Sequence, residues 1–147
     1  MLPKVYIGMP ITFADDHIAL FTRVAEACRG KLEPVLPTDA EETFRWSEDI
    51  RNFTVDIASR NMVERDIGKI KACDGAMFFL PAASIGTAME IVHAKLYGKP
   101  SLVAVPLSLL YHPWLRYHAT EVVWSTDMFG RDLDYLVNRM KKLIAGK

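Results

Sequence analysis

The strongest constraint on the fold is one short segment, DGAMFFLP (74–81), in which the apolar residues are continuous rather than alternating. A strand that has one face in water alternates polar and apolar side chains, so a continuous apolar segment indicates a strand that is buried on both faces. Such strands occur mostly in parallel sheets that carry helices on both sides. The segment therefore predicts an interior strand of an α/β protein.

Short apolar segments and helical patterns alternate along the rest of the chain, as in a parallel sheet with crossover helices. Strands are predicted over residues 4–9, 31–37, 74–81, 99–106 and 120–125. Helices are predicted over residues 15–30, 54–72, 85–98 and 132–144. Right-handed crossovers then give a three-layer, doubly wound sandwich of the flavodoxin or Rossmann-like type, with a five-stranded parallel sheet in the order 2-1-3-4-5.

The chain has 147 residues and shows no internal repeat or linker, so a single domain over residues 1–147 is expected. Two connections, 37–53 and 107–119, are longer than a plain sandwich needs, and long loops of compact domains are often functional. Their aromatic residues either contact a ligand or cover a subunit contact or a secondary core. These residues are Phe44, Trp46, Phe53, Tyr111, Trp114 and Tyr117.

The composition indicates which kind of molecule the chain binds. Eighteen basic residues balance eighteen acidic ones, so no net field attracts the chain to nucleic acid or membranes, and a small ligand is the expected partner. We expect a cytoplasmic protein, because no signal-peptide pattern or bilayer-length apolar segment is seen. Cys28 and Cys73 make no disulfide framework, and the histidines have no metal-ligand spacing. Neither a metal nor a cofactor is therefore expected.

A ligand of an open parallel sheet binds beyond the carboxyl ends of the strands, where the strand order reverses. Segments 6–12 and 80–84 are predicted to meet there, next to the start of a helix. The backbone amides of that start, with the hydroxyls of Ser84 and Thr87, suit an anion such as a phosphate. On local sequence alone, Ser84 is equally well explained as a plain helix cap.

Glu90 lies one turn into the predicted helix 85–98. At about 100° per residue it is displaced from the face formed by Met89, Val92 and Leu96, which is predicted to pack on the sheet. This position at the flank of the helix suits a reactive carboxylate that leans into the crevice. It suits a solvated surface glutamate as well, and the pattern leaves both interpretations open.

Asp66 lies in a row with Met62 and Ile70, beside the apolar stripe of its helix. A lone buried charge costs several kcal/mol, so an acid in this position is usually paired or functional. A local salt bridge to Lys69 or Arg65 is the alternative.

The segment that contains both acids, residues 64–100, resembles the nucleoside 2-deoxyribosyltransferase superfamily, which includes 2′-deoxynucleoside 5′-phosphate N-hydrolases and CMP N-glycosidases. The resemblance is carried by an acid-bearing helix, a CD dipeptide before an apolar strand, an S-x-G-x-x-x-E turn and a GKP sequence. The spacing of the two acids, 90 − 66 = 24 residues, agrees with the family. A weaker match covers VYIGMPI (5–11).

The resemblance implies that Glu90 is a nucleophile, which attacks the anomeric carbon of the sugar and forms a glycosyl-enzyme ester. It implies that Asp66 assists the leaving base or orients the substrate. Tyr6 matches an aromatic hydroxyl that contacts the nucleophile, and its hydrogen bond would keep the glutamate ionised and aimed.

Ser84 distinguishes two branches of the family. Members that act on free nucleosides usually carry an acid at this position, whereas the nucleotide hydrolases carry a serine that binds the 5′-phosphate, which a carboxylate would repel. Two positions depart from the family pattern, since Thr12 replaces an arginine of some phosphate-binding members and Ala88 replaces a glycine. Arg116 or His112 would supply the positive charge, across the interface of a homodimer or a dimer of dimers.

The resemblance thus implies hydrolysis of the N-glycosidic bond of a nucleoside or 2′-deoxynucleoside 5′-monophosphate, with release of free base and sugar 5-phosphate. Base exchange between deoxynucleosides and a non-catalytic nucleotide sensor are the alternatives. Phe13, Phe44 and Trp46 are candidates for stacking on the base. The predicted substrate-binding residues are Gly8, Pro10, Thr12, Trp46, Ser84, Gly86, Thr87, His112 and Arg116.

Overall fold

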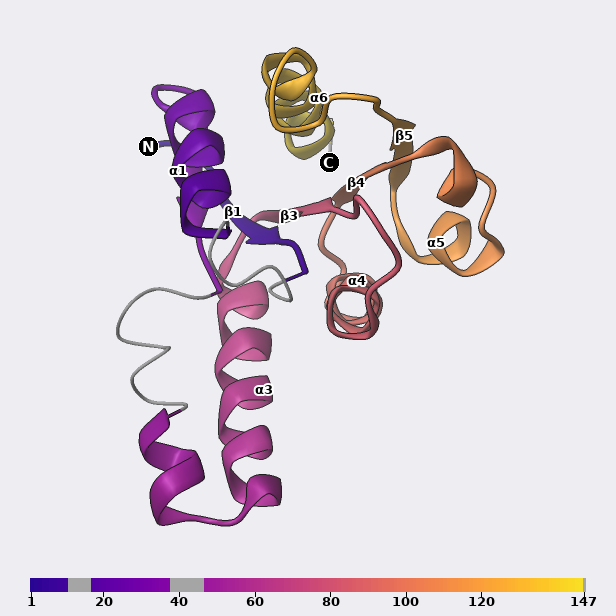
Figure 1. The fold of residues 1–147 in the computed structure, drawn as a ribbon. Coiled ribbons are helices and arrows are strands. Elements are labelled where there is room, and N and C mark those ends of the chain that lie inside the picture. The colour runs from indigo at the N-terminus through magenta and orange to yellow at the C-terminus, as the bar shows by residue number, and fades with distance from the viewer. Residues whose placement is uncertain (11–16, 38–46, 147) are drawn as a thin grey trace.

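A computed structural model describes residues 1–10, 17–37 and 47–146. Its centre is a parallel sheet whose strands follow the order β2-β1-β3-β4-β5 (Figure 1). The strands are β1 (Lys4–Gly8), β2 (Glu33–Val35), β3 (Gly75–Phe79), β4 (Ser101–Val105) and β5 (Glu121–Trp124). The predicted five-stranded sheet and its order are confirmed. The proline-bearing β2 lies at an edge, as predicted.

Helices cover both faces of the sheet, which confirms the three-layer architecture (Figure 1). One face is covered by α1 (His17–Cys28) and α6 (Leu133–Ala145). The other is covered by α3 (Val55–Ala72), α4 (Ile85–Leu96) and α5 (Pro113–His118). The helices described by the structure include none that is both long and apolar enough to cross a membrane.

Alternation along β1 decides which side chains reach each layer. Val5 and Ile7 pack with α1 and α6, whereas Tyr6 points to the face that carries α3 and α4. Every residue of β3 and β4 is buried, as the continuous apolar segments predict. The sheet therefore presents Tyr6 from its middle to the α3–α4 layer.

Both long connections contain helical segments. Residues 107–119 form a short 3-10 helix, η1 (Leu107–Leu109), and then α5, which begins with Pro113 at its first turn. Residues 47–52 are also helical, and they are tied to α3 because Asn61 donates a hydrogen bond of 3.2 Å to the Asp49 carboxylate. Phe44 and Trp46 lie outside the described residues.

The predicted packing face of α4 is wrong. Met89 and Leu96 are 59% and 70% exposed, and the residues buried against the sheet are Thr87, Ile91 and Ala94. Apolar residues surround most of this helix, so periodicity alone does not select the buried side. The side with small residues, Thr87 and Ala94, allows the helix to approach the sheet closely. The turn of the helix places Glu90 next to the buried row instead of away from it.

Candidate active site

A cavity of about 710 Å³ lies between α3 and α4, next to the residues that follow β1 and β3. This size is typical of pockets for small molecules. The location beyond the carboxyl ends of β1 and β3 is the one predicted from the reversal of strand order. The cavity is lined by Met9, Pro10, Pro37, Met62, Val63, Asp66, Ile67, Ile70, Ala83, Ser84, Ile85, Gly86, Thr87, Met89, Glu90 and His93.

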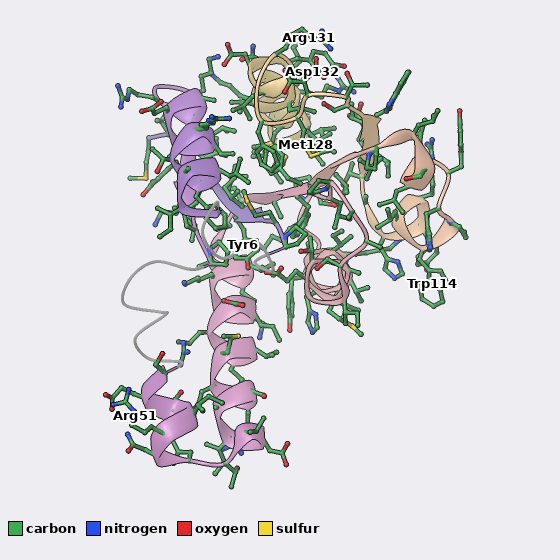
Figure 2. All side chains as sticks on the ribbon, in the orientation of Figure 1. Tyr6, Arg51, Trp114, Met128, Arg131 and Asp132 are labelled. Carbon is green, nitrogen blue, oxygen red and sulfur yellow. The ribbon has the colours of Figure 1, made fainter. Side chains whose placement is uncertain are left out.

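Glu90 is joined to the sheet by a hydrogen bond. Tyr6 is fully buried on the α3–α4 side of β1 (Figure 2), and its hydroxyl donates to Oε2 of Glu90. Glu90 is itself half-buried and lines the cavity. These contacts are not those of a solvated surface glutamate, which was one of the two interpretations of the sequence.

The surroundings of Glu90 disfavour its charged form. Burial raises the pKa of Glu90 from the ordinary 4.5 to about 8; the hydrogen bond from Tyr6 opposes this rise, and the charge of Asp66 adds to it. Burial also raises the pKa of Tyr6 well above its usual range, and the charges of Glu90 and Asp66 act in the same direction. Tyr6 therefore keeps its proton and remains a donor. A shifted carboxyl pKa in a cavity is typical of functional sites.

Asp66 lines the same cavity from α3, as do its row neighbours Met62 and Ile70. Its charge acts on the pKa of Glu90, so the two carboxyl groups are near enough to interact. The ammonium group of Lys69 donates hydrogen bonds to the carbonyl oxygens of Leu36 at 3.1 Å and Pro37 at 2.9 Å. The structure thus brings Asp66 and Glu90, which are 90 − 66 = 24 residues apart, to one cavity.

The start of α4 forms one end of the cavity. Ser84 is the N-cap, and its hydroxyl accepts a hydrogen bond of 3.5 Å from the backbone N–H of Thr87. Ser84 therefore acts as a helix cap, and it lines the cavity as well. The first turn of α4 contains no acidic residue, so the partial positive charge of the helix start is not offset there. This end of the cavity suits an anion.

The other predicted substrate-binding residues divide into three groups. Pro10, Gly86 and Thr87 line the cavity, whereas Gly8 is not among the lining residues. His112 and Arg116 belong to the α5 region, which lies away from Tyr6, as the position of Trp114 in Figure 2 shows. Thr12, Trp46, Phe13 and Phe44 lie outside the described residues.

The cations near α5 have contacts of their own within the chain. Arg116 donates a hydrogen bond from Nε to the Leu110 carbonyl at 2.9 Å, and its guanidinium lies 5.3 Å from the centre of the Tyr111 ring. His112 caps α5 by accepting a hydrogen bond from the backbone N–H of Trp114. Neither residue reaches the cavity that holds Glu90 in the same chain.

Sequence reasoning missed part of the wall of the cavity. Met9 follows β1 directly, and Met89 was assigned to the packed side of α4, so neither was predicted to face a ligand. His93, one turn after Glu90, lines the cavity, and its Nδ1 lies 2.8 Å from the Met89 carbonyl. For Met89 and His93, the available signal was their spacing from Glu90 on one helix, which becomes useful only once the buried side of α4 is known.

The described residues favour neither a metal centre nor a cysteine nucleophile. The part of the chain that the structure describes contains no group of three or more His, Cys, Asp or Glu residues able to hold a metal ion. Cys28 and Cys73 are buried free thiols, and burial raises the pKa of each to about 11. Such thiols are poor nucleophiles near neutral pH. The acids of the cavity are thus the strongest candidates for chemistry.

Solved structures with the same architecture include two proteins of known type. The CMP N-glycosidase BcmB of Clostridium botulinum superposes with a TM-score of 0.57 at 17% identity, over 92% of this chain and 96% of the other. A 2-deoxyribosyltransferase of Bacillus psychrosaccharolyticus gives 0.62 at 17% identity, over 90% and 95%. A conserved protein of Enterococcus faecalis V583 gives 0.60 at 14% identity, over 99% of each chain. At these identities the likeness shows the fold alone.

No curated protein sequence matches the chain. The family model described as nucleoside 2-deoxyribosyltransferase matches residues 5–140 and thus includes β1, the cavity and most of α6. The chain therefore belongs to the nucleoside 2-deoxyribosyltransferase family.

Proposed function

We propose that the protein hydrolyses the N-glycosidic bond of a nucleoside or 2′-deoxynucleoside 5′-monophosphate, releasing the free base and a sugar 5-phosphate. One observation carries the proposal: Glu90 and Asp66 line one cavity, and the Tyr6 hydroxyl binds Glu90. Glycosidases typically use two carboxyl groups beside the sugar to cleave the glycosidic bond through an oxocarbenium-like transition state. A sensor for an anionic nucleotide would gain nothing from them.

In the first step, an ionised Glu90 oxygen bonds to the anomeric carbon while the carbon–nitrogen bond breaks. The electron pair of that bond leaves with the base, whose nitrogen takes up a proton from water, and the Asp66 carboxylate orients the base as it leaves. In the second step, water adds to the anomeric carbon and the ester bond to Glu90 breaks, which restores the carboxylate. The proton lost by this water replaces the one that the base took up in the first step.

Because burial raises its pKa to about 8, Glu90 is mostly protonated near neutral pH. The Tyr6 hydroxyl favours the ionised form, because it donates a hydrogen bond to the carboxylate. It also fixes the position of one oxygen, which leaves the other for the attack. Tyr6 thus has both an electrostatic and an orienting role in the proposed reaction.

A 5′-phosphate would bind at the start of α4. Ser84 and Thr87 provide hydroxyls there, and the lack of an acid in the first turn leaves the helix dipole free to attract an anion. An acid at position 84 would repel the phosphate. The serine therefore supports a nucleotide over a free nucleoside as substrate. Trp46, the candidate for stacking on the base, lies outside the described residues.

We extend the proposal to assembly: two chains form a homodimer, or a dimer of dimers, through residues 107–119. Tyr111, Trp114 and Tyr117 are each about 70% exposed, which is costly for a monomer and favourable for an interface. In this dimer, Arg116 or His112 would face the phosphate held by Ser84 of the partner subunit. Light scattering at micromolar concentration tests the idea, because a species of 16.6 kDa that still turns over nucleotide would contradict it.

The deciding experiment is a panel of ribo- and deoxyribonucleosides and their 5′-monophosphates, incubated with and without a second free base, with products separated by chromatography. We expect free base and sugar 5-phosphate from a monophosphate. Formation of a new nucleoside would instead identify base exchange. No turnover by the wild type, together with normal nucleotide binding by Glu90→Ala, would identify a sensor. Glu64→Gln, which alters an exposed glutamate of α3, is the matched control for loss of activity in Glu90→Gln.

A further inference from the structure

We propose that Phe78, together with the bare backbone of Gly8 opposite it, is a positioning residue that holds the Tyr6 hydroxyl on the Glu90 carboxylate. The inference rests on the proposed function, in which Glu90 is the nucleophile. Phe78 does not line the cavity, so any effect on the reaction must pass through another residue.

The register of the sheet places the three residues together. Gly8 and Phe78 are direct partners in the pairing of β1 with β3. Tyr6 lies two residues before Gly8, so it projects from the same face of the sheet. The rings of Tyr6 and Phe78 have centroids 6.1 Å apart and planes tilted by 57°. The Phe78 ring thus extends across the position of Gly8 toward the phenol.

Position 8 requires a glycine because a side chain has no room there, and not because of the backbone conformation. Among the described glycines only Gly30 and Gly98 have a positive φ, which marks the conformation that favours glycine. A Cβ on Gly8 would lie 2.7 Å from Cε1 of Phe78, closer still to Cδ1, and 3.5 Å from Cε1 of Tyr6. Gly8 is one of the predicted substrate-binding residues, but its neighbours point to support for Tyr6 instead.

Tight packing makes this support effective. Tyr6 and Phe78 are both fully buried, and a close-packed interior transmits a change of volume to its neighbours. Phe78→Leu removes atoms beside the Tyr6 ring, which allows the phenol to move away from Glu90. Gly8→Ala adds atoms instead of removing them. Its new methyl group pushes the Phe78 ring against Tyr6, so the phenol is displaced from Glu90 in this variant too.

Within residues 1–10, 17–37 and 47–146, few titratable groups face Glu90, so its ionisation reports on small changes around it. Tyr6 faces it from β1 and Asp66 from α3, while His93 lines the cavity further along α4. Cys73 is near enough to influence the phenol. Burial and Asp66 raise the pKa of Glu90, and the Tyr6 hydrogen bond lowers it. A displaced phenol therefore shifts the titration of Glu90 to higher pH.

The test compares Phe78→Leu, Gly8→Ala, Tyr6→Phe and the double variant of Tyr6→Phe with Phe78→Leu. Two readouts are used: the pH dependence of kcat/KM, and NMR titration of isotopically labelled glutamate carboxyls in the ligand-free protein. The Glu90 signal is assigned from its loss in Glu90→Gln. We expect Phe78→Leu and Gly8→Ala to shift the titration upward by part of the Tyr6→Phe shift, with kcat/KM at pH 7 reduced several-fold. The double variant should shift no further than Tyr6→Phe alone.

Phe79→Leu is the matched control. Phe79 is equally buried on the same strand, but it faces α1 and α6 and stacks on Phe129 with centroids 5.0 Å apart. The substitution removes the same atoms and destabilises the fold to a similar degree, so it should leave the Glu90 titration unchanged. If Phe78→Leu is too unstable to study, Phe78→Met, which has about the volume of leucine on an adaptable unbranched chain, should shift the titration in the same direction.

The inference is overturned if Phe78→Leu titrates like the wild type, if Phe79→Leu shifts the titration equally, or if the shifts of Phe78→Leu and Tyr6→Phe add in full. Failure of the proposed function looks different. In that case the wild type turns over no nucleotide, while the NMR titrations still show whether Phe78 and Gly8 hold Tyr6 on Glu90.

Discussion

Replacement of Glu90 by glutamine should stabilise the protein in alkaline solution and abolish its proposed activity. The carboxamide of Glu90→Gln has nearly the shape of a carboxyl group, and its oxygen still accepts the hydrogen bond from Tyr6. The variant differs from the wild type only in that the side chain at position 90 no longer titrates. The difference in unfolding free energy between the variant and the wild type therefore isolates the effect of ionising Glu90 in its half-buried position.

The sign and size follow from the shifted pKa. Glu90 titrates near 4.5 when unfolded and at about 8 when folded, so between these values the native state binds more protons than the unfolded state. The stability of the wild type then falls as pH rises through this window, and the loss is complete above pH 8. A shift of 8 − 4.5 = 3.5 units at about 1.4 kcal/mol each gives an upper bound of about 5 kcal/mol. Water that reaches the half-buried carboxylate reduces this value.

Urea unfolding from about pH 5 to about pH 9 measures the effect, because other titrating groups cancel in the difference between the two proteins. The advantage of Glu90→Gln should be small at the acid end and should grow to several kcal/mol at the alkaline end. A difference that is constant over this range would refute the assigned pKa. Glu64→Gln, at an exposed position of α3, is the control for the removal of a carboxyl group away from the cavity.

Three further outcomes are expected. The kcat/KM of the wild type should rise about tenfold per pH unit and level off above the Glu90 pKa of about 8, and a flat profile between about pH 6 and pH 9 would contradict an ionised Glu90 as nucleophile. Ser84→Asp keeps a good helix cap but adds a negative charge, so it should raise KM for a 5′-monophosphate at least about tenfold and leave KM for free nucleosides unchanged. Ser84→Ala, which adds no charge, is its control. Equal effects of Ser84→Asp on both substrates would place the phosphate elsewhere. If sites are shared between subunits, mixing inactive Glu90→Ala with inactive Arg116→Ala subunits should restore part of the activity, and no recovery despite proven subunit exchange would count against the shared site.

Local sequence patterns predicted the strands and their order well, because a strand that is buried on both faces has a continuous apolar sequence. The continuous apolar segment 74–81 identified β3 as an interior strand, and the predicted strand order put β2 at an edge. The ends of α1 and α4 near Gly30 and Gly98 agree with their positive φ angles of 76° and 67°. These features depend on neighbours in sequence, so a single sequence is enough to read them.

The site was less accessible to sequence reasoning, since it depends on contacts between distant segments. The periodicity of α4 did not show which of its apolar sides meets the sheet, and the error hid the burial of Glu90. The pairing of Gly8 with Phe78 requires the register of β1 against β3. The family resemblance, rather than the periodicity, directed attention to Glu90, and the contact with Tyr6 then gave a physical reason for it.

The position of β1 between β2 and β3 has a consequence for how the protein folds. The hydrogen bond from Tyr6 to Glu90 joins residues 84 positions apart in the chain, and Val5 pairs with Gly75 across the sheet. Contacts of this separation carry a large loop-closure entropy and form late, after local helices. During synthesis, the amino-terminal strand must wait until β3 and α4 have been made. The Tyr6–Glu90 pair therefore assembles in one of the last steps of folding, and recovery of activity should lag behind the return of helical structure when the denatured chain is refolded.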